Sequence, residues 1–501
     1  MTAPLNGEIV RSKAVFVVLL LMLLGFVAST LVRWRMPTFI EMATPTASSA
    51  TAVVSSNFAP NIAPNASSAP KMPVASSSGS GKQPLSPLRV GALRWELLAP
   101  GLLVNAGLDP GENSLFVKAG VDAHLSVLDR MSEVEEALAR GGADAKGVDV
   151  AVIPMPEFIA AYERLRALEP RVFFVVGWSR GREALYAKQG SLTNLPEGEL
   201  TLRAEPGSSQ AFLGLFSLQL AGAPPTRLRF ELPSDKTPPD FEALSLMDIP
   251  KVDAASGKLQ LTSADAPMMV PIVAVAQAGF VDTHRAALTA WVRVWLEGED
   301  RIRADAATSA REISKQGGAP DPLVLINRLG PLSWANLADN ARWAGLSGRG
   351  ALTTESLFQR GWEVWKAAGL LSTPLPEAPA SSPTIISALV RQLGTDQGTE
   401  KFNKNSDLPR GSHNDVLLRF AFSAAEVDED ALAGEIGFLA GLFDRSTLRV
   451  AVRGTAAIHK AKAAKAVAAA IGRFGLAENR LQIASQPART ASATIEVLGA
   501  R

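Results

Sequence analysis

The sequence contains no cysteine, and this absence excludes several kinds of chemistry at once. Disulfides, cysteine-ligated zinc, thiol nucleophiles and a lipid anchor attached through a lipobox all require that residue. A chain without cysteine remains compatible with an extracytoplasmic location. Any catalytic or binding function must therefore come from other side chains.

Histidine is scarce, and the net charge of the chain is close to zero. The sequence holds four histidines, and no two of them have the spacing of metal ligands: His124, His284, His413 and His459. We therefore expect no metal site, no histidine-based triad and no cofactor. A formal net charge of +1 gives no electrostatic reason to expect nucleic-acid binding.

An uncharged apolar run, Ala14–Val32, stands near the N-terminus. At ~1.5 Å per residue, a helix of this length nearly spans a hydrocarbon core of ~30 Å. Phe26 interrupts the small-residue pattern of a signal-peptide cleavage site, so we expect an uncleaved anchor within residues 1–36. Basic residues flank the run on both sides, and the positive-inside rule does not decide its orientation. We expect a single-pass inner-membrane protein with most of the chain in the periplasm.

Two segments have the composition of linkers. Residues 37–87 are rich in Ser, Ala and Pro, and residues 372–413 are rich in Pro, Ser and Gly, with a candidate short helix at 385–393. Such segments bury too little apolar surface to offset the entropy of ordering them. They separate a predicted large domain, residues 88–371, from a predicted small one, residues 414–501.

Strands alternate with helices in the large domain, which favours a mostly parallel sheet covered by helices. The pattern predicts strands at 88–93, 115–117, 148–154, 172–176 and 270–276, a loop at 95–100, and helices at 129–140, 156–168, 282–297, 308–315, 322–328, 332–344 and 354–367. A smaller strand–helix–strand block at 200–232 interrupts this series. We therefore expect two lobes, the first formed by about 88–180 and 268–371 and the second by about 181–267.

The turn Pro206-Gly207-Ser208-Ser209 leads directly into an apolar helix. Either serine suits the N-cap of that helix. The first amides of a helix lack partners within it and lie at the positive end of its dipole, so they attract anions and polar groups. A purely capping serine is the alternative interpretation.

The order of several motifs over 88–371 is informative. Along the chain stand Val90-Gly91 with Trp95 and Pro100, Asp149-Val150-Ala151, Ser179-Arg180-Gly181-Arg182-Glu183-Ala184-Leu185, Gly207-Ser208-Ser209, Asp265-Ala266, and Phe280 with His284. In this order they resemble type II periplasmic solute-binding proteins of the nitrate, sulfonate, taurine and thiamine-precursor class. The resemblance implies an α/β, two-lobed type II periplasmic-binding-protein fold that closes around a small solute.

The resemblance also implies a set of ligand-binding residues in the interlobe cleft: Trp95, Ser179, Arg180, Ser208, Ser209 and Asp265. In this interpretation Trp95 supplies an apolar wall and Arg180 pairs with an anion. The alternatives are packing for Trp95, a solvated loop charge for Arg180 and a turn cap for Asp265. A working cleft would supply an ABC permease or a sensor.

The pattern of the small domain predicts strands at 415–422, 448–453, 481–484 and 493–497 and helices at 426–443 and 460–474. The segment Leu448–Gly454, with Gly475-Leu476 and Ile495-Glu496-Val497, is similar to the α+β OmpA-like fold. The family's peptidoglycan-binding Asp aligns near Ala456 or Ala457, and its Arg aligns with Ala463. Because Arg makes the bidentate carboxylate contact, we expect a degenerate domain without peptidoglycan binding.

We therefore expect a membrane-anchored extracytoplasmic solute-binding protein that takes a small polar or anionic solute and performs no chemistry. An enzyme on the same fold is one alternative, but the predicted cleft loops offer only Glu96 and Glu157 as candidate catalytic groups. A cell-envelope scaffold with a non-functional cleft is the other alternative.

Overall fold

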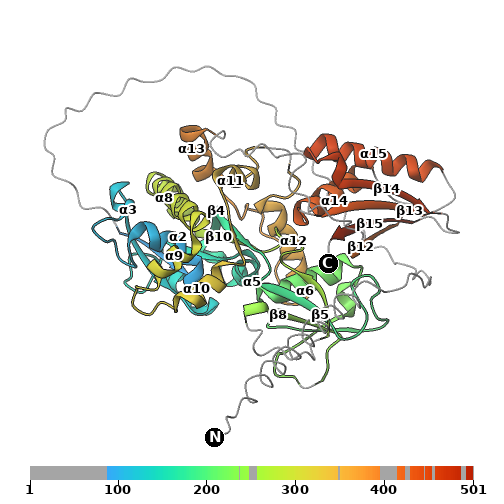
Figure 1. Ribbon diagram of the computed structural model, residues 1–501, viewed down its shortest axis with the longest axis horizontal. Helices are drawn as coiled ribbons and strands as arrows, with labels where there is room; N and C mark the ends of the chain where they lie inside the picture. Colours follow the sequence, from blue (N-terminus) through green and yellow to red (C-terminus); the bar gives the residue numbers. More distant parts are fainter. Residues whose placement is uncertain are drawn as a thin grey trace, which may run out of the picture. The chain divides into compact units, whose positions relative to one another are not determined.

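The computed structural model describes residues 87–235, 237–247, 257–347, 350–394, 415–423, 429–444, 446–453, 457–486 and 492–499 (Figure 1). These residues belong to the compact unit Gly81–Arg501. The expected anchor Ala14–Val32 lies outside the described residues, as do residues 37–86 of the first linker. Within the described ranges, no helix combines the length and apolar character needed to cross a bilayer.

The first sheet has six strands in the order β11-β4-β10-β3-β1-β2. They are β1 (Pro87–Ala92), β2 (Asp122–Val127), β3 (Val150–Pro154), β4 (Pro170–Ser179), β10 (Pro271–Gln277) and β11 (Leu332–Trp334). Strand β1 runs parallel to β2 and β3, whereas β10 runs antiparallel to β3 and β4. Every residue of β3 is buried, as expected for a central strand with helices on both faces.

The second sheet has five strands in the order β7-β6-β8-β5-β9. They are β5 (Glu183–Ala187), β6 (Leu200–Arg203), β7 (Leu228–Glu231), β8 (Phe241–Ser245) and β9 (Lys258–Thr262). Strand β6 is parallel to β7 and β8, and β5 is antiparallel to β8 and β9.

Apart from the edge strand β11, the two sheets have equivalent strand orders. The order is β2-β1-β3-β10-β4 in the first sheet and β7-β6-β8-β5-β9 in the second. Strands β10 and β5 hold the same place in these orders, and each is antiparallel to both of its neighbours. The antiparallel strand in each case enters directly from the other sheet: β5 follows β4, and β10 follows β9. The chain therefore crosses between the sheets twice, at residues 180–182 and 263–270. We call the first sheet with its helices lobe 1 and the second sheet with its helix lobe 2.

Helices pack on both sheets. In chain order they are α2 (Trp95–Asn105), α3 (Leu115–Lys118), α4 (Met131–Arg140), α5 (Met155–Leu165), α6 (Ser209–Leu220), α7 (Ala278–Thr283), α8 (Arg285–Ala304), α9 (Ala306–Ile313), α10 (Pro322–Leu329), α11 (Leu337–Trp343), α12 (Thr354–Ala367) and α13 (Thr384–Leu393). Helix α6 packs on β5 and β8 of the second sheet (Figure 1). Helix α8 packs on α2 and buries Trp291 and Trp295 completely.

Helix α12 packs on helices of both lobes. Its Trp365 donates from Nε1 to the Pro156 carbonyl of α5 at 3.0 Å, and the Trp365 ring lies 5.7 Å from the ring of Phe212 in α6. A Cβ on Gly361 would approach Ile159 of α5 to 2.6 Å, so the absence of a side chain allows this close packing. Buried aromatic side chains thus join the two lobes.

Three sequence-based predictions were wrong. Residues 95–100 begin helix α2 instead of a loop, and residues 115–117 belong to the helical turn α3, which Ser114 caps. The predicted helix at 332–344 is strand β11 followed by α11. The short helix expected at 385–393 is confirmed as α13 (Thr384–Leu393). Helix α2 is buried on nearly all sides, which removes the amphipathic pattern that identifies a helix.

The C-terminal sheet has the order β12-β15-β13-β14. Its elements are β12 (Asp415–Ser423), α14 (Glu429–Leu442), β13 (Thr447–Arg453), α15 (Ala457–Phe474), β14 (Leu481–Gln486) and β15 (Ser492–Gly499). The six predicted elements of this segment are confirmed. Arg480 donates to the carbonyls of Ala440 and Phe443 at 2.9 Å each and so satisfies the C-terminal end of α14.

Candidate functional site

The candidate site lies where the strands of the first sheet end. Strands β1 and β3 are adjacent and parallel, and each leads into a helix whose first turn carries a glutamate. These residues are Glu96 in α2 and Glu157 in α5. Because the connections from β1 and β3 diverge at this point, their carboxyl ends border the crevice in which open α/β sheets bind ligands.

Glu96 is completely buried and forms an ion pair with Arg182 of the first crossing. Arg182 Nη2 donates to Glu96 Oε1 at 2.6 Å, and Arg182 is itself buried. Arg328 of α10 approaches Glu96 Oε2 to 3.9 Å. The start of α2 therefore holds a buried carboxylate whose charge is offset by two guanidinium groups of the same chain.

Glu157 connects the two lobes. Ser209, the first residue of α6, donates from Oγ to Glu157 Oε1 at 3.0 Å, and Arg94 Nη2 lies 4.0 Å from the same oxygen. Burial raises the pKa of Glu157, while the charge of Arg94 and the hydrogen bond from Ser209 act in the opposite direction. A side chain from lobe 1 and the N-terminus of a lobe 2 helix thus meet at the junction of the lobes.

Ser263 fixes the two crossings to each other. Its Oγ accepts hydrogen bonds from the backbone amides of Gly181 at 2.8 Å and Arg182 at 3.0 Å, and its own amide donates to the Glu183 carbonyl at 2.9 Å. Gly181 has a φ of +91°, a conformation that favours glycine. These contacts tie the two crossings to each other beside the ion pair of Arg182 with Glu96.

The predicted ligand residues occupy different environments. Ser208 is the N-cap of α6, as predicted, and its Oγ accepts from the Ala211 amide at 3.2 Å. Ser179 is buried, and its Oγ donates to Glu183 Oε2 at 2.6 Å. Asp265 accepts from the amide and hydroxyl of Thr262 at 2.8 and 2.9 Å, which closes a turn.

The other two predicted residues lie at the cleft-side ends of β1 and β4. Trp95 is the partly buried first residue of α2, and the amide of Arg180 donates to the Pro331 carbonyl at 2.7 Å. The structure therefore brings Ser209 to Glu157 and Ser179 to Glu183, while Ser208 and Asp265 make local capping contacts. A ligand-binding role for these six residues stays a prediction.

Sequence reasoning missed the ion pair between Glu96 and Arg182. Glu96 belongs to a predicted cleft loop and Arg182 to the motif Ser179–Leu185, but 86 positions separate them along the chain. Only the order of the strands brings the two side chains together. A single charge at an otherwise apolar helix start was the available signal, because Glu96 is followed directly by the run Leu97–Val104. Among the described residues, no group of three or more His, Asp or Glu side chains is placed to hold a metal ion.

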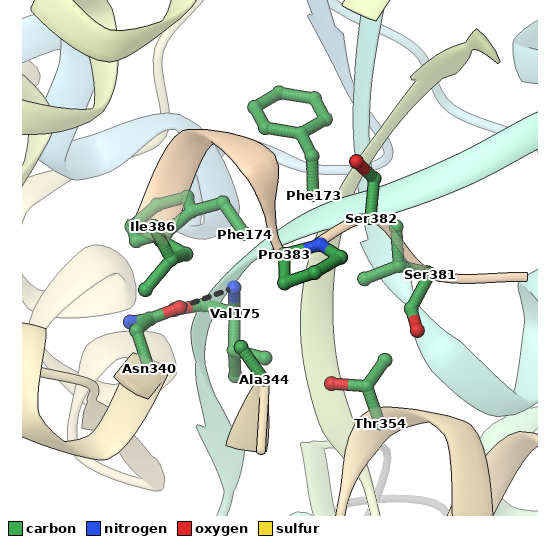
Figure 2. Close-up of a pocket in the computed structure, with 11 residues that line it drawn as sticks. Phe173, Phe174, Val175, Asn340, Ala344, Thr354, Ser381, Ser382, Pro383 and Ile386 are labelled. Atoms are coloured by element: carbon green, nitrogen blue, oxygen red, sulfur yellow. Dashed lines mark hydrogen bonds between the residues drawn. The ribbon is translucent and has the colours of Figure 1, made fainter. Parts of the chain in front are cut away.

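A small pocket of about 30 Å³ lies elsewhere, along the outer edge of β4 (Figure 2). The Asn340 side chain accepts from the Val175 amide at 2.8 Å and donates to the Val175 carbonyl at 2.9 Å. The Ser382 amide donates to the Val172 carbonyl at 2.8 Å. Side chains and the 380–383 segment thereby cover an otherwise unpaired strand edge. No ionisable side chain lines this pocket, and we assign it a structural role.

No protein-family model matches the chain, and no curated protein matches it. Solved structures give weak likenesses. The aliphatic sulphonate binding protein SsuA from Escherichia coli has 16% identity and a TM-score of 0.40, with 58% of this chain and 89% of that chain covered. The nitrate-binding protein NrtA from Synechocystis PCC 6803 has 14% identity and a TM-score of 0.36, with coverages of 62% and 98%.

A zinc-bound ligand-binding component of an ABC-type import system from Staphylococcus aureus has 13% identity and a TM-score of 0.41, with coverages of 61% and 99%. These TM-scores are too low to establish a shared fold. The two-lobed architecture of this chain rests on the strand order of its own two sheets.

Proposed function

We propose that this chain is a membrane-anchored extracytoplasmic solute-binding protein with a type II periplasmic-binding-protein fold. It captures a small polar or anionic solute between its lobes and serves ABC-type uptake or sensing without catalysing a reaction. The exchange of β5 and β10 between two sheets of equal strand order supports this proposal, because paired crossings form a hinge about which two lobes can close.

The contact between Ser209 and Glu157 is the observation that carries the proposal. It places the N-terminus of α6, with its free amides and positive dipole end, opposite the helix starts of lobe 1. Arg94, the cation beside Glu157, has 39% of its side chain exposed and is therefore accessible to a solute. An anionic group would bind Arg94 and the α6 amides, with the Ser209 hydroxyl turning from Glu157 to the solute.

Thermal unfolding of the full chain against small sulfonates, carboxylates, amino acids, phosphate, nitrate and pyrimidines tests this proposal. A ligand at ~100 times its Kd adds about 2.7 kcal/mol of stability, so the transition temperature should rise for one class of compound. We expect Ser209→Ala to weaken the response. Ser217→Ala is the matched control, because it makes the same change later in α6, where the buried hydroxyl has no hydrogen-bond partner.

A cell-envelope scaffold is the second candidate, and two observations favour it. The ion pair between Glu96 and Arg182 fills part of the cleft with the chain's own charges, and the contact between Phe212 and Trp365 joins the lobes through buried rings. A scaffold of this kind would show no thermal response to any compound in the panel. It would instead bind a partner protein or the cell wall.

For the C-terminal domain we propose a degenerate OmpA-like fold that serves as a spacer or protein-contact module. The element order β-α-β-α-β-β of β12 to β15 supports this assignment. Ala463, which aligns with the family's carboxylate-binding Arg, is a buried residue of α15. The adjacent Lys462 and Lys465 are the available cations, and Lys is a weaker bidentate partner than Arg, which argues against peptidoglycan binding.

A further inference from the structure

Helix α14 of the C-terminal domain contacts both lobes and the second crossing. Its Glu435 forms an ion pair with Arg360 of α12, and its Phe438 ring lies 6.3 Å from the Phe216 ring of α6. The Leu442 carbonyl at its C-terminal end accepts from the Met268 amide of the second crossing at 3.3 Å. We call these contacts, together with the close approach of Gly441 to Leu352, the α14 interface.

Two glycines of α14 allow this close approach. A Cβ on Gly437 would lie 2.8 Å from Ala351, although it would also meet Phe474 of its own domain. A Cβ on Gly441 would lie 2.6 Å from the Cβ of Leu352, and the three nearest atoms to it all belong to Leu352. Leu352 is buried and directly precedes Thr353, the N-cap of α12. A side chain at position 441 would therefore clash directly with the segment that leads into α12.

We propose that the α14 interface holds the two lobes in their closed arrangement, so that release of the C-terminal domain controls access to the cleft. This inference rests on the proposed function, since it assigns regulation to the same cleft. The interface joins three parts that must move relative to one another on opening: α12 packed on α5 of lobe 1, α6 of lobe 2, and the hinge segment at Met268. A rigid helix bound to all three opposes that motion.

The coupling is reciprocal by thermodynamic necessity. A partner that pulls the C-terminal domain away would favour the open lobes, and a solute that closes the lobes would favour the docked domain. Arg360 strengthens the docked state twice, because its guanidinium also lies 5.3 Å from the centre of the Phe438 ring.

Spin-label distances in the full chain test this proposal, and the absence of native cysteine permits selective labelling. One pair, Lys118→Cys with Thr226→Cys, places exposed labels on lobe 1 and lobe 2. A second pair, Thr226→Cys with Ala468→Cys, reports release of the C-terminal domain. The perturbing variant is Gly441→Leu, which inserts a side chain against Leu352 and raises the helix propensity of α14.

Gly434→Leu is the matched control, because no atom lies within 4 Å of a Cβ at that position of the same helix. We expect the parent and Gly434→Leu to give one narrow interlobe distance. Gly441→Leu should add a longer population for both label pairs. The proposal is overturned if the C-terminal domain is released while the interlobe distance stays unchanged, or if neither distance changes.

The measurement requires no solute, so its outcome is independent of the thermal panel. If the lobes open in Gly441→Leu but no compound raises the transition temperature, the regulatory role of the α14 interface is supported and the solute-binding function is refuted. If a compound raises the transition temperature but the interlobe distance stays unchanged, the solute-binding function is supported and the regulatory role is refuted.

Discussion

The ion pair between Glu96 and Arg182 should be strongly coupled, because both side chains are buried where the lobes meet. At 2.6 Å and an effective dielectric constant of about 20, their attraction is roughly 6 kcal/mol before desolvation is counted. Loss of one partner of such a pair typically costs 3–5 kcal/mol, because the other charge stays buried. Arg328 at 3.9 Å partly compensates Glu96, so we expect Arg182→Met to cost about 3 kcal/mol.

A double-mutant cycle measures this coupling. Urea unfolding followed by tryptophan fluorescence gives the free energy of unfolding of the parent, Arg182→Met, Glu96→Leu and the double variant. We expect the double variant to be far more stable than the sum of the single losses predicts. The exposed pair Arg130–Glu133 on the surface is the control, and its cycle should show no measurable coupling. Additivity of Glu96→Leu and Arg182→Met within about 0.5 kcal/mol would refute the buried pair.

Three further predictions follow from other buried groups. Glu299 is completely buried, and desolvation raises its pKa well above the usual range. The stability that its protonated form contributes is therefore fully present below about pH 4.3, the pKa of Glu in the unfolded chain. That contribution is lost as the pH rises through the pKa of the folded state. Glu299→Gln should therefore gain stability relative to the parent as the pH is raised from 5 to about 8, and a difference independent of pH would contradict this. Ser263→Ala removes the acceptor of the amides of Gly181 and Arg182 and should cost about 1–3 kcal/mol in urea unfolding, whereas a neutral result would mean that the crossings are held otherwise. Gly361→Ala forces a methyl group to 2.6 Å from Ile159 and should lower the unfolding free energy by about 1–3 kcal/mol, and an unchanged value would show that α5 and α12 are loosely packed.

The elements that were predicted correctly carry strong local signals. Strands β3 and β10 are short apolar runs of β-branched residues, and Ser208 follows a Pro-Gly turn that favours an N-cap. Strand β2 (Asp122–Val127) was missed because its sequence DAHLSV mixes polar and apolar residues. Helix α2 was assigned to a loop at its start because Pro100 and an unbroken apolar run hide the helical period.

The site was harder to predict than the fold because its contacts are long-range. Ser209 is 52 positions from Glu157, and Ser263 is more than 80 positions from Gly181. Sequence patterns report on neighbours along the chain, whereas these pairs depend on which strands exchange between the sheets. Ser209 was selected as a helix-start residue, but its partner Glu157 follows from topology alone.

Native mass spectrometry of the full chain, titrated with the same solute panel, tests the central claim most directly because it counts bound molecules. The single interlobe cleft predicts one bound molecule per chain for one class of compound. Arg94→Ala should weaken that binding because it removes the cation beside the α6 N-terminus, whereas Arg130→Ala, which removes an exposed cation elsewhere on lobe 1, should not. An unliganded mass with every compound of the panel would contradict the solute-binding account and favour the scaffold.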